Sequence, residues 1–229
     1  MAAIPLEKAI EYPTSDGQPM AETTLHREVM TDSIGALKRR YASVPDVWVG
    51  GNLFLCYRQG DPKAAIAPDV LLAKGVEKWP RPNYLLWEER PPSLVIEVTS
   101  RKTASEDRNK KKRIYQEIGV EELFLFDPYE EYLRPRLQGF CLKNGRYEPI
   151  PRHLDGSLLS RTTGLTLRPE ANRLRLVDTA TGEPLLWDDE LEAARVAEAE
   201  ARQAAESRAR ALDEELQRLR RELEGRSGG

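Results

Sequence analysis

Two carboxylates interrupt stretches of the chain that are otherwise apolar. Asp69 follows Pro68 in the segment IAPDVLL, and Glu97 lies within the segment SLVIEV. A carboxylate in a buried strand carries a large desolvation cost unless it is ion-paired or binds a cation. Two such groups on adjacent strands would form an oxygen-rich site suited to a hard ion such as Mg²⁺. Asp69 and Glu97 are therefore candidate metal ligands and candidate catalytic residues.

A third candidate group is cationic and follows Glu97 in the chain. Asp107, Lys111 and Tyr115 are spaced by four residues, which places them on one face of a helix. If that face looks toward the strand ends, Lys111 can stabilise charge that develops on a phosphate. Mg²⁺ or Mn²⁺ between the carboxylates would polarise the phosphoryl oxygen and lower the pKa of an attacking water. These residues predict phosphodiester hydrolysis, with Asp107 and Tyr115 as supporting groups.

The charge of the chain is unevenly distributed. Residues 101–113 carry seven basic and two acidic side chains, and residues 189–229 carry 11 acidic and 8 basic ones. The C-terminal segment thus accounts for the whole net charge of -3 and leaves a neutral remainder with one basic run. Such a run attracts a polyanion, whereas the neutral remainder excludes a protein that coats DNA tightly. The candidate nucleic-acid contacts are Lys102, Arg108, Lys110 and Lys112.

Each candidate residue also has a plain structural interpretation. Asp69 can cap a turn, and Glu97 can form a structural ion pair with Lys111. Asp107 can be a surface acid that pairs with Lys111 four residues later. Tyr115 is typical of a core position, and the basic run alone is typical of a solvated helix face. The sequence leaves these alternatives open.

The elements that would position these residues form a βαβ unit. The β-branched run 93–98 and the run 123–126 are typical of strands buried on both faces, and a helix over 104–118 separates them. We expect the two strands to be parallel neighbours joined by a right-handed crossover. An amphipathic helix is predicted over 23–41, after an extended arm at 1–20.

The remaining elements are short strands and one long helix. Strands are predicted at 47–49, 52–57, 64–72, 158–167, 174–177 and 185–186, and a hairpin at 139–149 turns at Asn144-Gly145. Residues 188–224 contain no proline or glycine and predict a helix of roughly 50 Å. Its leucines at 212, 216, 219 and 223 follow heptad spacing, which favours a coiled coil. We therefore expect two domains, 1–187 and 188–229.

Several motifs in order resemble those of the Uma-two family of restriction endonucleases, a bacterial group within the PD-(D/E)XK nuclease superfamily. The similarity covers roughly residues 10–187. The motifs are Pro68-Asp69, Glu97-Val98-Thr99-Ser100, the segment from Asp107 through Lys111 and Tyr115 to Gly119-Val120, and Leu125-Phe126-Asp127-Pro128.

The resemblance implies an α/β (mixed α+β) fold: a restriction-endonuclease-like core with a mixed central sheet flanked by helices, plus a long C-terminal helix. It implies that Asp69 and Glu97 are the two acids of the PD-(D/E)XK motif. The lysine expected two residues after Glu97 is replaced by Thr99. Either Lys111 substitutes for it, with Lys102 as second choice, or the site is impaired. The resemblance also makes Glu28, on the first helix, a candidate metal-site acid.

These observations lead to a Mg²⁺-dependent DNA endonuclease, expected to form a homodimer. The alternative is a catalytically impaired nuclease-fold adaptor that assembles through its C-terminal helix. No apolar run is long enough to span a bilayer, so we expect a soluble cytoplasmic protein without a membrane partner. Cys56 and Cys141 are expected to be reduced thiols. The tryptophans at 48, 79, 87 and 187 are expected to be packing residues.

Overall fold

The computed structural model describes residues 12–13, 23–100 and 107–227 of the chain. It divides into two compact units, residues 1–185 and residues 186–229, which are described separately here. The predicted arm at 1–20 lies almost wholly outside the described residues. The predicted helix over 104–118 is described only from residue 107 onward.

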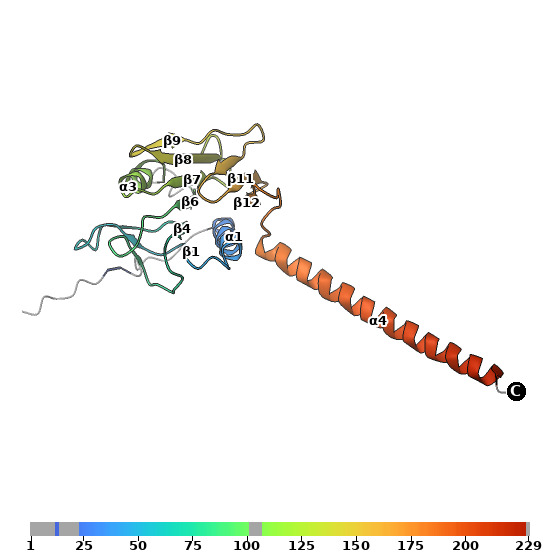
Figure 1. The fold of residues 1–229 in the computed structure, drawn as a ribbon. Coiled ribbons are helices and arrows are strands. Elements are labelled where there is room, and N and C mark those ends of the chain that lie inside the picture. Colours follow the sequence, from blue (N-terminus) through green and yellow to red (C-terminus); the bar gives the residue numbers. More distant parts are fainter. Residues whose placement is uncertain (1–11, 14–22, 101–106, 228–229) are drawn as a thin grey trace, which may run out of the picture. The chain divides into compact units, whose positions relative to one another are not determined.

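The first unit begins with helix α1, Thr24–Arg40 (Figure 1). Thr23 adopts an extended backbone, and its hydroxyl accepts a hydrogen bond from the amide of His26, which is a typical N-cap. Three basic residues occupy the last turn, where they complement the negative end of the helix dipole. These end signals explain why the helix follows the predicted range within one residue at each end.

A mixed six-stranded sheet forms the centre of this unit, in the order β1-β4-β6-β7-β8-β9. Strands β6 and β7 are parallel and all the other neighbours are antiparallel, which confirms the predicted βαβ unit. The connection between β6 and β7 ends in a π-helical turn, η1, and a short helix, α3. The bounds are β1 Val47–Gly50, β4 Val70–Lys74, β6 Leu94–Val98, η1 Asp107–Lys111, α3 Lys112–Glu117, β7 Glu122–Phe126, β8 Leu137–Lys143 and β9 Arg146–Pro149.

Two small sheets accompany the central one. The first has the order β3-β2-β5, and the second is the antiparallel series β10-β11-β12. Asn144 and Gly145 both have positive φ angles in the turn between β8 and β9, as the predicted hairpin requires. The bounds are β2 Leu55–Cys56, β3 Ala65–Ile66, β5 Tyr84–Leu85, β10 Leu158–Ser160, β11 Leu165–Glu170 and β12 Arg173–Asp178.

Some predicted strands are shorter than expected. The 52–57 segment forms a strand only at 55–56, and the 64–72 segment is divided around Pro68, which cannot donate a backbone hydrogen bond. Residues 185–186 were expected to be an edge strand, and this prediction is wrong. Leu185 makes one backbone hydrogen bond to Leu176 next to an isolated bridge at Pro184, and no strand forms there.

Hydrophobic clusters lie on both faces of the central sheet. One contains residues of α1 together with the even-numbered positions of β4 and β6; the other contains residues of α3 with the odd-numbered positions of those strands. Alternation along each strand thus assigns its side chains to two separate cores. This confirms a mixed α/β architecture in which helices flank a mixed sheet. The strands that carry or adjoin the predicted acids are well packed on both faces.

The second unit consists mainly of helix α4, Asp188–Ser227. Asp188, Asp189 and Glu190 occupy its first turn, where acids complement the helix dipole. Leu212, Leu216 and Leu219 are exposed by 61%, 54% and 44%. Among the described residues, no helix is long and apolar enough to cross a membrane.

Candidate active site

Asp69 immediately precedes β4, and its side chain is largely buried. Its Oδ2 atom accepts a hydrogen bond from the backbone amide of Val98 at 2.7 Å and lies 3.1 Å from Nε2 of His26. Oδ1 accepts no hydrogen bond from any residue that the structure describes. One oxygen therefore holds the carboxylate in place, and the other is available to a ligand.

Glu97 lies within β6, and its side chain is fully buried. The Tyr115 hydroxyl donates a hydrogen bond to Oε1 at 2.5 Å, and Nζ of Lys111 lies 2.8 Å from Oε2. Tyr115 and Lys111 are four residues apart at the junction of η1 and α3, so the predicted helical face does meet this strand. The ion pair with Lys111 supplies the compensation that a buried carboxylate needs.

Antiparallel pairing of β4 and β6 brings the two acids together. Val70 is the register partner of Ile96, so Asp69 and Glu97 lie one residue beyond that pair on adjacent strands. Lys111 links the two positions, because its ammonium also donates to the carbonyl of Ala67 at 3.3 Å. Side chains from two strands and the following helix thus converge on one site.

The environment keeps Asp69 ionised. Burial by itself raises the pKa of this carboxyl, but the neighbouring His26 imidazole and the charge of Lys111 oppose it. The amide of Val98 acts in the same direction, so the pKa of Asp69 is lowered below its ordinary value. Such a carboxylate is ready to bind a cation without first losing a proton.

His26 is a contact that the sequence analysis missed. It lies on the buried face of α1, four residues before Met30, whereas the sequence-predicted acid Glu28 is exposed. Within the contacts of the described residues, Glu28 does not meet Asp69 or Glu97. A polar residue within the apolar stripe was the available signal, because a buried imidazole requires a polar partner.

The position of the missing motif lysine is occupied by a buried hydroxyl. The amide of Thr99 donates to the carbonyl of Phe126 at 2.7 Å, but its Oγ1 has no hydrogen-bond partner in the part of the chain that the structure describes. Thr99 therefore does not replace a lysine chemically. The ammonium group that contacts Glu97 comes from Lys111 instead.

The predicted nucleic-acid contacts have different environments. Lys110 is exposed, whereas Lys112 is half-buried with Nζ 3.3 Å from the centroid of the Phe140 ring. Burial lowers the pKa of Lys112, and its cation–π contact turns its charge toward the protein. Lys102 and the side chains of Asp107 and Arg108 lie outside the described residues.

Two other buried carboxylates are engaged differently. Asp127 accepts hydrogen bonds from the amides of Tyr129, Tyr132 and Leu133. Glu122 accepts from the Ser160 hydroxyl and from the amides of residues 161 and 162. Their local backbone contacts indicate a structural role in holding turns.

The carboxylate oxygens of the site suit a hard divalent cation that takes only one or two of its ligands from the protein. Across the described residues, no group of three or more His, Cys, Asp or Glu side chains is placed to hold a metal. Mg²⁺ nevertheless binds through one or two carboxylates while it keeps several waters. Asp69 and Glu97 are the residues that could hold such an ion, and both oxygens of Glu97 are already engaged by Tyr115 and Lys111.

Comparison with known protein families identifies the family of this chain. The family model described as "Uma2: Putative restriction endonuclease" matches residues 2–171. The chain belongs to the Uma2 family. Both acids, Lys111 and Tyr115 lie within the matched residues, as does the whole βαβ unit. This confirms the expected family, and with it a nuclease-like protein of the restriction-endonuclease type.

A solved structure is also similar to this Uma2 chain. It is described as a putative nuclease belonging to DUF820 from Anabaena variabilis ATCC 29413, with 14% sequence identity and a TM-score of 0.45. The alignment covers 62% of this chain and 75% of that one. Comparison with curated proteins gives no match.

Proposed function

We propose that this protein is a Mg²⁺-dependent endonuclease that hydrolyses DNA phosphodiester bonds. The observation that carries the proposal is the convergence of two carboxylates and one ammonium at the ends of adjacent strands. Oδ1 of Asp69 accepts no hydrogen bond from the described residues, and Nζ of Lys111 lies 2.8 Å from Oε2 of Glu97. Membership in a family of this description supports the same reaction class.

Each residue of the site has a separate task in this mechanism. Asp69 and Glu97 would hold the metal ion, which when bound polarises a phosphoryl oxygen and lowers the pKa of water. His26 fixes the orientation of Asp69, and the Tyr115 hydroxyl fixes that of Glu97. Preorganised side chains of this kind lower the cost of assembling the transition state.

Lys111 supplies positive charge where a phosphate would become more negative. Its side chain is 13% exposed, so the ammonium borders solvent while it contacts Glu97. In a partly desolvated site, a charge of this kind acts more strongly than it would in water. Lys111 thereby performs the role that Thr99 cannot perform.

The decisive experiment compares Glu97→Gln with Glu121→Gln. Glu121 is exposed, so both variants lose one carboxylate, but only the first loses a predicted metal ligand. With Mg²⁺ or Mn²⁺ and plasmid DNA, we expect wild type and Glu121→Gln to nick the duplex. Glu97→Gln should lose cleavage by about 10²-fold or more.

Titration calorimetry with Mn²⁺ provides a readout besides activity. Wild type should bind the ion, and Asp69→Asn should abolish that binding while circular dichroism remains native. Equal cleavage by Glu97→Gln and wild type would overturn the assignment of this site.

A second candidate function is a nuclease-fold adaptor without activity. The buried, unpartnered hydroxyl of Thr99 at the motif lysine position favours it, as do the exposed leucines of α4. This reading predicts no Mn²⁺ binding at Asp69 and no cleavage by wild type. The calorimetric titration therefore separates the two candidates.

We also propose that the partner of α4 is a second copy of the chain. With Leu212 and Leu219 at d positions, Leu216 occupies an a position. Parallel pairing then brings Arg208 at g opposite Asp213 at e, and Glu215 opposite Arg220. Complementary e and g charges favour a parallel homodimer, which would provide two cleavage sites.

A further inference from the structure

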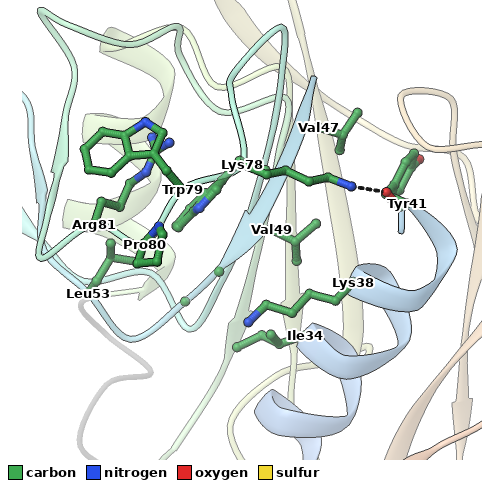
Figure 2. A pocket seen from close by; sticks show the side chains of 13 residues that line it. Ile34, Lys38, Tyr41, Val47, Val49, Leu53, Lys78, Trp79, Pro80 and Arg81 are labelled. Atoms are coloured by element: carbon green, nitrogen blue, oxygen red, sulfur yellow. Dashed lines mark hydrogen bonds between the residues drawn. The ribbon is translucent and has the colours of Figure 1, made fainter. Parts of the chain in front are cut away.

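A pocket runs along β1, the edge strand of the central sheet, and we call it the β1 edge pocket (Figure 2). Its volume is about 540 Å³, within the usual range for small-molecule sites. The C-terminal half of α1 forms one wall, and the segment after β4 forms the other. The lining includes Ile34 and Lys38 of α1, Val47 and Val49 of β1, and Trp79 and Pro80.

Three basic residues line the β1 edge pocket. Among the described residues that line it, the charged ones are Lys38, Lys78 and Arg81. Lys78 donates to the carbonyls of Tyr41 and Ala42 at the end of α1, and Arg81 is buried in an ion pair at 2.7 Å with Glu89. Lys38 is exposed and has no partner among the described residues. An anionic group entering the pocket would therefore meet Lys38.

The pocket also presents an aromatic surface. Trp79 was expected to be a packing residue, but it is 47% exposed, so that expectation is wrong for this tryptophan. The Arg81 guanidinium lies 4.5 Å from the centroid of the Trp79 ring and 4.6 Å from that of Trp48. Stacking against a buried, ion-paired arginine fixes the indole plane while one side of it remains open. Such a surface suits a flat ring.

Backbone contacts connect this pocket to the candidate active site. Gly51 lines the pocket, and a Cβ atom on it would lie 1.9 Å from the carbonyl oxygen of Asp69. The next amide, that of Asn52, donates to the carbonyl of Pro68 at 2.8 Å. The floor of the pocket is thus packed directly against the residue that carries the proposed metal-binding carboxylate.

We propose that the β1 edge pocket binds one unpaired nucleotide of the DNA substrate, with its base on Trp79 and its phosphate near Lys38. The apolar floor and the exposed indole match a base, and the exposed Lys38 ammonium matches a phosphate. The inference rests on the proposed function, because the pocket adjoins the site of cleavage. It names the substrate class as DNA with an unpaired base, from a single strand or extruded from a duplex.

Binding is measured by fluorescence anisotropy in EDTA, so that no cleavage is needed. The probes are a labelled short oligothymidylate, a fully paired duplex and the same duplex with one mismatched pair. Wild type should bind the single strand or the mismatched duplex more tightly than the paired duplex. The preferred probe distinguishes a single-stranded source from an extruded base. Equal binding of all three probes would overturn the proposal.

The charge is tested with Lys38→Gln against Lys63→Gln, a matched loss of one exposed lysine outside the pocket. For oligothymidylate, the slope of log K against log salt should decrease in magnitude by about 0.7 only in Lys38→Gln. Identical slopes in the two variants would contradict a phosphate contact at Lys38.

The base contact is tested with Trp79→Ala and Trp79→Phe. Stacking of one base is worth about 1–3 kcal/mol, so Trp79→Ala should bind oligothymidylate roughly 5- to 150-fold more weakly. Trp79→Phe should retain most of the affinity, which a merely structural role would not predict.

These measurements also separate the two proposals. Loss of cleavage in Glu97→Gln with wild-type binding by Trp79→Ala would overturn the pocket and keep the nuclease. Weaker binding by Trp79→Ala, with no cleavage by wild type, would keep the pocket and overturn the nuclease.

Discussion

At the scale of single residues, the site combines two acids of different character. Asp69 is held through one oxygen by His26 and a backbone amide, whereas Glu97 is engaged at both oxygens by Tyr115 and Lys111. A metal ion that binds both must therefore compete with Lys111 for Glu97. Substitution of Lys111 is therefore the most informative test of the site.

Lys111→Ala is expected to reduce the cleavage rate by about 10²–10³-fold, because it removes the charge nearest the phosphate. The matched control is Lys110→Ala, which removes an exposed neighbour and should change the rate by less than about threefold. Initial rates of plasmid nicking with Mg²⁺ measure both. Equal losses in the two variants would show that only general attraction of DNA is involved.

Thr99→Val is expected to raise the free energy of unfolding by about 1 kcal/mol. The buried Oγ1 of Thr99 has no partner among the described residues, and an unsatisfied hydroxyl costs about 1–3 kcal/mol. Urea denaturation measures the change, with nicking activity as the second readout. A destabilised variant would show instead that the hydroxyl is satisfied in solution.

At the scale of elements, the site depends on how the helices pack against the strands that carry or adjoin the two acids. α1 contributes His26, β4 and β6 contribute the acids, and the η1–α3 junction contributes Lys111 and Tyr115. π-Helical turns are often found at functional sites, and here η1 ends on Lys111. α1 packs in one hydrophobic cluster and α3 in the other, and β4 and β6 contribute residues to both. The side chains are therefore positioned by packing.

The β11–β12 hairpin gives a prediction about pH. Hydrogen bonding by Arg175 is the main cause that lowers the pKa of Glu170 below its ordinary value of 4.5, and burial opposes it. A depressed carboxyl pKa adds stability above the unfolded value, and this stability disappears as the pH falls through the folded value.

Wild type should therefore exceed Glu170→Gln in stability at pH 7 and lose that advantage near pH 3. Because the Glu170 side chain is 43% exposed, the difference should stay below about 1 kcal/mol. Urea denaturation at both pH values checks the sign. A difference that does not change with pH would contradict it.

At the scale of the whole molecule, the chain divides into two units of different composition. The first unit holds the candidate site, and the second is dominated by a 40-residue helix with exposed leucines. Exposed apolar residues at heptad spacing are costly unless they pair with another surface. We therefore expect assembly to depend on α4 and chemistry to depend on the first unit.

Leu216→Lys should convert the proposed dimer into a monomer, because it places a charge in the centre of the seam. The matched control is Gln217→Lys, which adds the same charge at a neighbouring exposed position. Sedimentation velocity of the full chain should show a dimer for wild type and for the control. A monomeric wild type, or a dimeric Leu216→Lys, would contradict the coiled coil.

The sequence alone predicted the features that depend on local pattern. Continuous β-branched runs identified β6 and β7, heptad spacing and the lack of proline identified α4, and Asn144-Gly145 identified a hairpin turn. The costly position of Glu97 in an apolar strand marked the site, and its assignment as a metal ligand stays a prediction. These inferences succeed because propensity and burial act over a few neighbouring residues.

Tertiary structure alone decided which distant residues meet. The contact of His26 with Asp69 joins positions 43 residues apart, counted from their numbers in the chain. No local pattern encodes that contact, because it arises from packing α1 against the start of β4. The presence of Trp79 and Lys38 in one pocket depends equally on how α1 and the segment after β4 enclose β1. Helix and strand periods determine the direction of a side chain, whereas its partner is determined by the packing of whole elements.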